Sequence, residues 1–177
     1  SLDIVAIDES GNVVCWNNKG YEEWEHRISG VANNNPIFGD VNNDGVLDVV
    51  FATDKGHLWA LHGDTGKPLP YFPLQLKGEV IEQPILINFG NSSVPLMSII
   101  AATTAGKLYI TDATLPCTQE IDIGEPIYST VLADDVTGNG KLDLIISTMH
   151  GKVFAMGTQI PFDALNTWSS RWQGVNG

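Results

Sequence analysis

The chain has 177 residues, enough for one sizeable hydrophobic core, and its formal net charge at pH 7 is −12. This charge argues against nucleic acid or an anionic membrane surface as a partner, because both attract basic patches. Hydrophobic residues make up 43% of the chain, beside 18 glycines and 9 prolines, which is typical of a β-rich globular protein. No uncharged apolar run reaches the roughly 18 residues of a membrane-spanning helix, and the start has no signal-like segment. We therefore expect a soluble chain.

A repeat organises the sequence. Four glycines, Gly11, Gly56, Gly106 and Gly151, are separated by 45, 50 and 45 residues. Each glycine follows one β-type run and precedes another, so each unit predicts a β-hairpin with glycine at its turn. The runs before the glycines cover residues 2–5, 47–50, 97–100 and 142–145, and those after them cover residues 13–16, 58–61, 108–110 and 153–156.

Further β-type runs flank these hairpins, at residues 36–41, 80–89 and 127–133 before them and at residues 22–28 and 69–76 after them. Four short strands in a period of about 45 residues are typical of a β-propeller blade. No segment shows a sustained helical period, which excludes helical-repeat solenoids. We predict an all-β fold of about four propeller blades that form part of a larger propeller. The expected blades are residues 1–30, 31–78, 79–124 and 125–160, followed by an exit segment over residues 161–177.

The aromatic residues of the second hairpin strands are interpreted as packing between blades rather than as a ligand box, because neighbouring blades bury both faces of a sheet. These residues are Trp16, Trp59, Tyr109 and Phe154.

The loop from Asp40 to Asp48 carries the strongest functional signal. Oxygen-bearing side chains occupy positions 1, 3, 5 and 9 of this nine-residue stretch, and Gly45 at position 6 allows a sharp turn. Calcium takes six to eight oxygen ligands at about 2.3–2.6 Å. We therefore predict a calcium site in this loop. Sites of this kind usually have a structural role. The expected ligands are Asp40, Asn42, Asp44, the Val46 carbonyl and Asp48.

The same loop differs from an EF-hand, which requires a bidentate Glu at position 12 and flanking helices. Position 12 is Phe51, and both flanks are short β-type runs, so the loop joins two strands. The alternative interpretation is a polar hairpin held by Asx turns, although such turns rarely need three carboxylates.

A second loop of this kind lies in register two repeat steps later. Its expected ligands are Asp135, Thr137, Asn139, the Lys141 carbonyl and Asp143. With two carboxylates rather than three, it predicts weaker calcium binding or a solvated turn. The corresponding stretch of the third unit, residues 90–98, has no carboxylate and contains a glycosylation sequon at Asn91. In the first unit, Asp3 takes the place of Asp48.

The period, together with Phe38-Gly39 before the acidic loop, resembles the FG-GAP repeat of integrin alpha subunits. The resemblance implies that each repeat is a propeller blade with calcium in the loop between its first two strands. At a finer level, residues 2–8, 11–16, 121–125, 131–134 and 142–149 are similar to plant proteins of the Defective in Exine Formation family. This similarity implies a calcium-binding, membrane-anchored cell-surface protein of the secretory pathway with a role in pollen exine patterning. The implied single-pass anchor lies outside these residues.

We predict an extracellular, calcium-stabilised interaction module whose partner is a protein or a polysaccharide. Two other functional classes are alternatives to it. Residues 56–67 resemble the blade signature of pyrroloquinoline-quinone dehydrogenases, although such enzymes hold cofactor and calcium at a central site. A hydrolase has little support, because the histidines lack metal-ligand spacing and no G-x-S-x-G element is present. These histidines are His26, His57, His62 and His150. We therefore expect a non-enzymatic protein.

The two cysteines, Cys15 and Cys117, lie 102 residues apart in different repeats. The sequence leaves open whether they form a disulfide.

Overall fold

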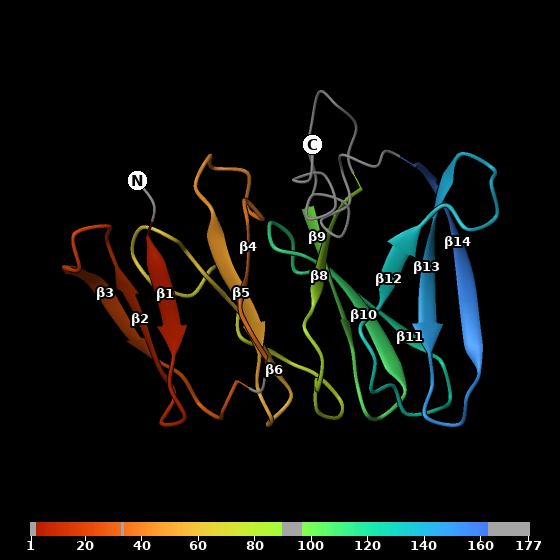
Figure 1. Cartoon of the computed structure of the whole chain (residues 1–177), viewed down its shortest axis with the longest axis horizontal. Coiled ribbons are helices and arrows are strands. Elements are labelled where there is room, and N and C mark those ends of the chain that lie inside the picture. The colour runs from red at the N-terminus through yellow and green to blue at the C-terminus, as the bar shows by residue number, and fades with distance from the viewer. Residues whose placement is uncertain (1–2, 33, 90–96, 163–177) are drawn as a thin grey trace.

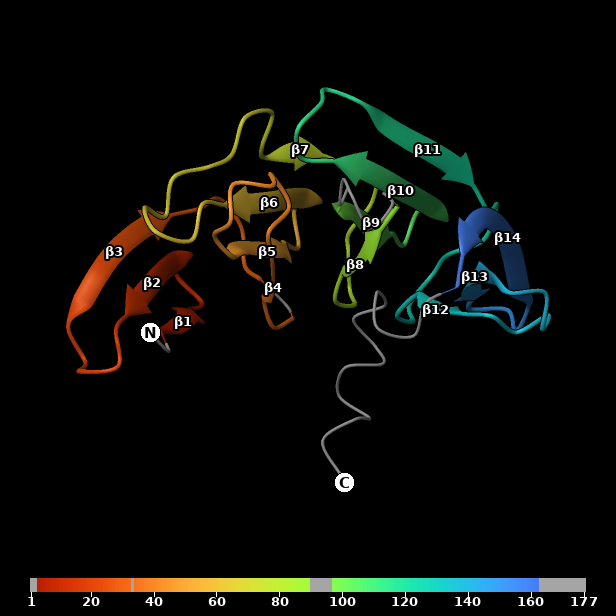
Figure 2. The ribbon, with the colours of Figure 1, turned by 90° about the horizontal axis from the view of Figure 1, so that it is seen from above.

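The structure is a computed structural model that describes residues 3–32, 34–89 and 97–162. These residues form four antiparallel β-sheets, which we call blades 1 to 4 in chain order. The sheets follow one another along an arc, with blade 1 and blade 4 at its two ends (Figures 1 and 2). The predicted all-β propeller fold is confirmed.

Each strand pairs with its neighbour in the chain. Blade 1 contains β1 (Ile4–Ile7), β2 (Asn12–Trp16) and β3 (Glu22–Arg27). Blade 2 contains β4 (Ile37–Gly39), β5 (Asp48–Ala52), β6 (His57–Leu61) and β7 (Leu74–Gln75). Blade 3 contains β8 (Ile85–Asn88), β9 (Met97–Ala102), β10 (Lys107–Asp112) and β11 (Thr118–Asp122). Blade 4 contains β12 (Leu132–Asp134), β13 (Lys141–Ser147) and β14 (Val153–Pro161).

The repeated glycines occupy equivalent hairpin turns. Their φ angles lie between 73° and 83°, a region that side chains with a Cβ rarely adopt. In three blades the residue directly after the outer strand donates its amide to the carbonyl of the hairpin glycine. The bonds are Ile28 to Gly11 at 2.8 Å, Leu76 to Gly56 at 2.8 Å and Ile123 to Gly106 at 2.9 Å. These bonds fix which residues are equivalent from blade to blade.

Among the described residues, the hydrophobic core consists of three clusters, one at each junction between successive blades. Val13 and Cys15 of β2 pack with Phe51 and Trp59 at the first junction, and Tyr109 is buried at the second. Trp16, by contrast, lies half-buried in β2, paired with the exposed Ile4 of β1. The packing interpretation therefore fits Trp59 and Tyr109 better than Trp16.

The outer strand of blade 2 is shorter than the run at residues 69–76 suggested. Only Leu74 and Gln75 pair with β6 as a strand. Pro70 and Pro73 interrupt this run, and proline has no amide to donate to a sheet. In blade 4, the described residues provide three strands, and β14 extends over nine residues.

Residues 163–177 of the expected exit segment lie outside the described residues, as does Asn91. Both cysteines are free thiols: Cys15 is buried and Cys117 is exposed. Within the ranges that the structure describes, no helix has the length and apolarity needed to cross a membrane.

Candidate metal centre

The predicted calcium loop connects β4 and β5 of blade 2. Asp48, its last position, is the first residue of β5 and is completely buried. The chain adopts positive φ at Asn43 (63°) and at Gly45 (87°), the fourth and sixth positions. These two left-handed residues turn the loop back so that its carboxylates face its own backbone amides.

Both carboxylate oxygens of Asp40 accept hydrogen bonds from backbone amides of this loop. Its Oδ1 accepts a hydrogen bond from the Asp44 amide at 3.0 Å, and its Oδ2 accepts one from the Gly45 amide at 2.9 Å. Asp44 in turn accepts a bond from the Val46 amide through Oδ1 at 2.8 Å and one from the Asn42 side-chain amide through Oδ2 at 2.7 Å. The bond from Val46, the Asn42 amide and His62 lower the pKa of the Asp44 carboxyl.

Asp48 contrasts with these carboxylates because one of its oxygens lacks a partner. Its Oδ2 accepts a hydrogen bond from the Val41 amide at 3.2 Å. Its Oδ1 is buried and has no hydrogen-bond partner in the part of the chain that the structure describes. Burial, followed by the charges of Asp44 and Asp40, raises the pKa of the Asp48 carboxyl to about 6. A buried anionic oxygen without a donor is costly unless a cation or a proton compensates it.

His62 is a loop contact that sequence reasoning missed. Its Nε2 lies 2.9 Å from Asp44 Oδ2, and its Nδ1 accepts the Asp64 amide at 3.3 Å. Because Nδ1 accepts, the neutral ring carries its proton on Nε2 and donates it to Asp44. This contact depends on the register of the β5–β6 hairpin, which places the end of β6 beside the start of β5.

The second predicted loop, between β12 and β13, reproduces the first. Gly138 and Gly140 have positive φ at the positions of Asn43 and Gly45. Asp135 accepts the amides of Asn139 and Gly140 at 3.0 and 2.7 Å. Asn139 Oδ1 accepts the Lys141 amide at 2.7 Å, as Asp44 accepts the Val46 amide. The two loops therefore share one backbone conformation.

Side chains distinguish the second loop from the first. Asp143 is almost fully buried, but its Oδ2 accepts both the amide and the hydroxyl of Thr137, at 3.2 and 3.1 Å. Lys141 Nζ reaches Gln159 Oε1 at 2.7 Å. The neutral Asn139 replaces the carboxylate of Asp44, so this loop is less anionic and its buried aspartate is better satisfied. Both differences agree with the expectation of weaker cation binding.

The carboxylates of the two loops do not point toward a common centre in this structure. Among the described residues, no three His, Cys, Asp or Glu side chains lie close enough together to hold a metal ion. Asp40, Asp44 and Asp48 instead accept bonds from nearby amides, as the Asx-turn alternative expects. The residue set nevertheless fits calcium at the first loop, because Asp48 Oδ1 is buried without a donor and its neighbours are anionic. The calcium ligands stay a prediction.

The segment that resembles a quinoprotein signature has a structural role in this chain. After β6, Gly63 accepts the indole N–H of Trp24 from blade 1 at 2.6 Å. A Cβ on Gly66 would lie 2.3 Å from the Trp24 ring, so the ring lies directly against that glycine. These residues join blade 1 to blade 2.

Comparison with known families bears directly on the loop at Asp40. Residues 1–69, which include blade 1 and blade 2 as far as the turn after β6, match the model of an FG-GAP-like repeat. This part of the chain is an FG-GAP-like repeat. The predicted resemblance is confirmed at this level, whereas the finer resemblance to plant exine proteins stays a prediction.

Among curated proteins, the chain is 22% identical over 107 residues to a lambda-carrageenase of Pseudoalteromonas carrageenovora. The match covers 60% of this chain and 9% of that protein. A second lambda-carrageenase, from another Pseudoalteromonas, matches to the same extent. The chain therefore spans about a tenth of the length of these relatives.

Solved structures share the fold. BamB from Moraxella catarrhalis matches with a TM-score of 0.63 and 18% identity, over 89% of this chain and 43% of that chain. BBS1N, crystallised with ARL6DN, matches with a TM-score of 0.61 and 11% identity, over 91% of this chain and 48% of that chain. The computationally designed Ika4 protein matches with a TM-score of 0.55 and 14% identity, over 88% of this chain and 84% of that chain.

Proposed function

We propose that the chain is part of a calcium-stabilised β-propeller that binds an extracellular partner, with calcium in the loop from Asp40 to Asp48. The observation that carries this proposal is Asp48 Oδ1, which is fully buried and lacks a donor within the described residues. The FG-GAP-like repeat over residues 1–69 supports it, because repeats of this type often bind calcium in this loop.

The proposed role of the ion is structural. The loop joins the first two strands of blade 2, and Asp48 belongs both to the loop and to the fully buried strand β5. An ion that draws Asp40, Asp44 and Asp48 together would fix β4 against β5 and neutralise the buried carboxylate. The loop from Asp135 to Asp143 is proposed as a second, weaker site.

We propose a binding role rather than an enzymatic one, with an extracellular protein or polysaccharide as the partner class. The distant similarity to lambda-carrageenases supports a polysaccharide-related setting. The net charge of −12 disfavours nucleic acid as a partner. From the sequence resemblance alone, we further propose a plant cell-surface location in the secretory pathway, with a single-pass anchor outside these residues and a role in pollen exine patterning.

Thermal unfolding with calcium and with a chelator tests the calcium site. Calcium at about 100 times its dissociation constant should stabilise the fold by about 2.7 kcal/mol. The Asp40→Asn variant should lose most of this shift. Asp8→Asn is the matched control, because Asp8 also accepts backbone amides in an exposed turn but lies in the blade 1 hairpin. Identical melting midpoints of the unaltered protein with calcium and with chelator would contradict the proposal.

A further inference from the structure

The turn that follows β6, residues 62–66, lies directly against the predicted calcium loop. His62 Nε2 is 2.9 Å from Asp44 Oδ2. A Cβ on Gly63 would lie 1.9 Å from the carbonyl oxygen of Leu47, so the Gly63 backbone packs against the loop backbone with no room for a side chain. Leu47 directly follows Val46, whose carbonyl is an expected calcium ligand. The turn therefore contacts the loop at one expected ligand and beside another.

The same turn also binds blade 1. The Gly63 carbonyl accepts the indole N–H of Trp24 at 2.6 Å. Trp24 is 7% exposed, and its ring lies against Gly66. A buried N–H without a partner is unfavourable, so the packing of Trp24 depends on the position of the Gly63 carbonyl. Gly63 thus contacts the calcium loop on one side and blade 1 on the other.

Hydrogen bonds within the turn hold it as one unit. The amides of Thr65 and Gly66 donate to the His62 carbonyl at 3.2 and 2.8 Å, and the His62 amide donates to the Lys67 carbonyl at 2.8 Å. The Asp64 amide donates to His62 Nδ1 at 3.3 Å. Energetic coupling between two sites is carried by rigid elements of this kind. A displacement on the loop side of the turn therefore also displaces the side that holds Trp24.

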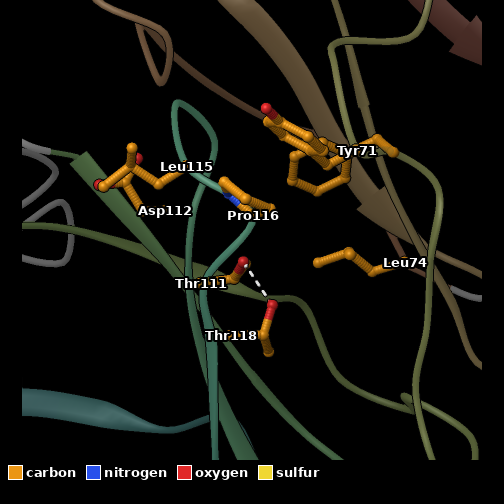
Figure 3. A pocket seen from close by; sticks show the side chains of 8 residues that line it. Tyr71, Leu74, Thr111, Asp112, Leu115, Pro116 and Thr118 are labelled. Carbon is orange, nitrogen blue, oxygen red and sulfur yellow. Dashed lines mark hydrogen bonds between the residues drawn. The ribbon is translucent and has the colours of Figure 1, made fainter.

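The corresponding turn of blade 3, residues 112–116, has a different arrangement. It lies 50 residues after the first turn, the step that also separates the hairpin glycines of these two blades. Asp112 accepts the amide and the hydroxyl of Thr114, both at 2.7 Å. A pocket of about 470 Å³ lies between this turn and Tyr71 and Leu74 of blade 2 (Figure 3). Among the described residues, the indole bond of the first junction has no counterpart at this turn.

The second acidic loop differs from the first in the same respect. Strand β14 continues through residues 153–161, where blade 2 has β6 and its turn. A Cβ on Gly157 would meet Asp143 Oδ1 only at 3.5 Å, which is an ordinary contact distance. Within the part of the chain that the structure describes, the first loop alone lies against a turn that also binds another blade.

We propose that the turn at residues 62–66 couples calcium binding in the first loop to the junction between blades 1 and 2. Calcium bound through Asp44 and the Val46 carbonyl fixes the backbone against which Gly63 packs, and this strengthens the hydrogen bond from Trp24. Coupling between two sites is reciprocal, so the Trp24 bond in turn raises the calcium affinity. Trp24 and Gly63 act as positioning residues, because neither is an expected ligand. This inference rests on the proposed calcium site.

Calorimetric calcium titration of the whole chain tests the coupling with a matched pair of variants, Trp24→Phe and Trp59→Phe. Both tryptophans are 7% exposed and belong to the core cluster of the first junction. Trp24 donates to the turn, whereas the Trp59 N–H has no hydrogen-bond partner among the described residues. Trp24→Phe should weaken calcium binding at the tighter site about fivefold, and Trp59→Phe should leave it unchanged. Equal calcium affinities of the two variants would overturn the proposal.

Hydrogen exchange of the two indole N–H groups, followed by NMR in the unaltered chain, is a second measurement that needs no variant. Relative to chelator, calcium should slow exchange at Trp24 about fivefold more than at Trp59. Equal slowing at both indoles would mean that the ion stabilises the whole fold without acting through the turn. That result would overturn the coupling and leave the calcium site in place. Calorimetry that detects no calcium binding by the unaltered chain would overturn both.

Discussion

Trp24 donates its indole N–H to the carbonyl of Gly63 at 2.6 Å, across the junction between blades 1 and 2. The two residues are 39 positions apart in the chain. Blades are often described as packing through apolar faces alone, but this junction also has a directional bond at its outer edge. The turn that follows β6 therefore contacts both blade 1 and the predicted calcium loop, because Gly63 binds Trp24 and His62 contacts Asp44.

The first prediction concerns Gly66, on which the Trp24 ring lies. Gly66→Ala should destabilise the fold by about 1–3 kcal/mol more than Gly20→Ala, because overpacking adds to the backbone strain. Both glycines have positive φ (65° and 80°). A Cβ would meet the indole at 2.3 Å at Gly66, whereas nothing lies within 4 Å of one at Gly20. Urea unfolding of both variants measures the difference, and equal losses would show that the Trp24 contact contributes little.

The second prediction compares the two acidic loops at their fifth position. Asp44→Ala should weaken calcium binding more than Asn139→Ala, because it removes a charged ligand from the more acidic loop. Each truncation removes the side-chain acceptor of one loop amide, that of Val46 at 2.8 Å or that of Lys141 at 2.7 Å. Asp44→Ala also removes the contacts to Asn42 and His62. Calorimetric titration of both variants is the measurement. Equal losses of affinity would reverse our ranking of the loops.

The repeat and the loops were predictable from sequence because both depend on local spacing. Glycines at equivalent hairpin turns need positive φ, and a nine-residue acidic loop contains its own acceptors and amides. The hydrogen bonds of Asp40 and Asp135 accordingly reach only four and five residues along the chain. Residues that interact within one turn leave a pattern that can be recognised without a structure.

Contacts that depend on sheet register or on neighbouring blades could not be predicted. His62 approaches Asp44 because β5 and β6 pair with Val49 opposite Leu61, and a shift of one residue would point this histidine away. Trp24 reaches Gly63 only because two blades stack. The apolar content of residues 69–76 predicts a full strand, but Pro70 and Pro73 lack the amides that strand pairing needs, and only Leu74 and Gln75 pair with β6.

The third prediction concerns the buried carboxyl of Asp48 without calcium. Its folded-state pKa is raised from 3.8 to about 6, mainly by burial. A raised carboxyl pKa means that the folded state holds the proton more tightly. The contribution of Asp48 to stability is therefore complete below pH 3.8 and is lost as pH rises through about 6.

The Asp48→Asn variant isolates this effect, because its side chain cannot ionise. We measure the free energy of unfolding of the variant minus that of the unaltered chain, in chelator. This difference should be up to about 3 kcal/mol more favourable to the variant at pH 7.5 than at pH 3.5. The same variant should lose calcium stabilisation. Urea unfolding from pH 3.5 to pH 7.5 gives the free energies of both proteins. A difference between them that stays constant with pH would contradict the raised pKa.

The last prediction concerns the two ends of the arc, where the outer faces of blades 1 and 4 carry exposed apolar side chains. Ile4 is 62% exposed on β1, and Leu132 and Val153 are 55% and 66% exposed on blade 4. Propeller blades normally bury both faces against neighbours, and uncovered sheet faces and edges favour association. We therefore expect the isolated chain to self-associate, with a mass by light scattering above the 19.2 kDa of one chain.

Paired substitution of Ile4→Lys and Val153→Lys should shift the chain toward the monomer, because each places a charge on one end face. Both side chains are already mostly exposed, so the fold should be retained. Met149→Lys is the control, since Met149 is 65% exposed at the blade 4 hairpin turn, and it should leave the mass unchanged. A compact monomer of the unaltered chain with a sharp cooperative melt would show that these end faces need no partner.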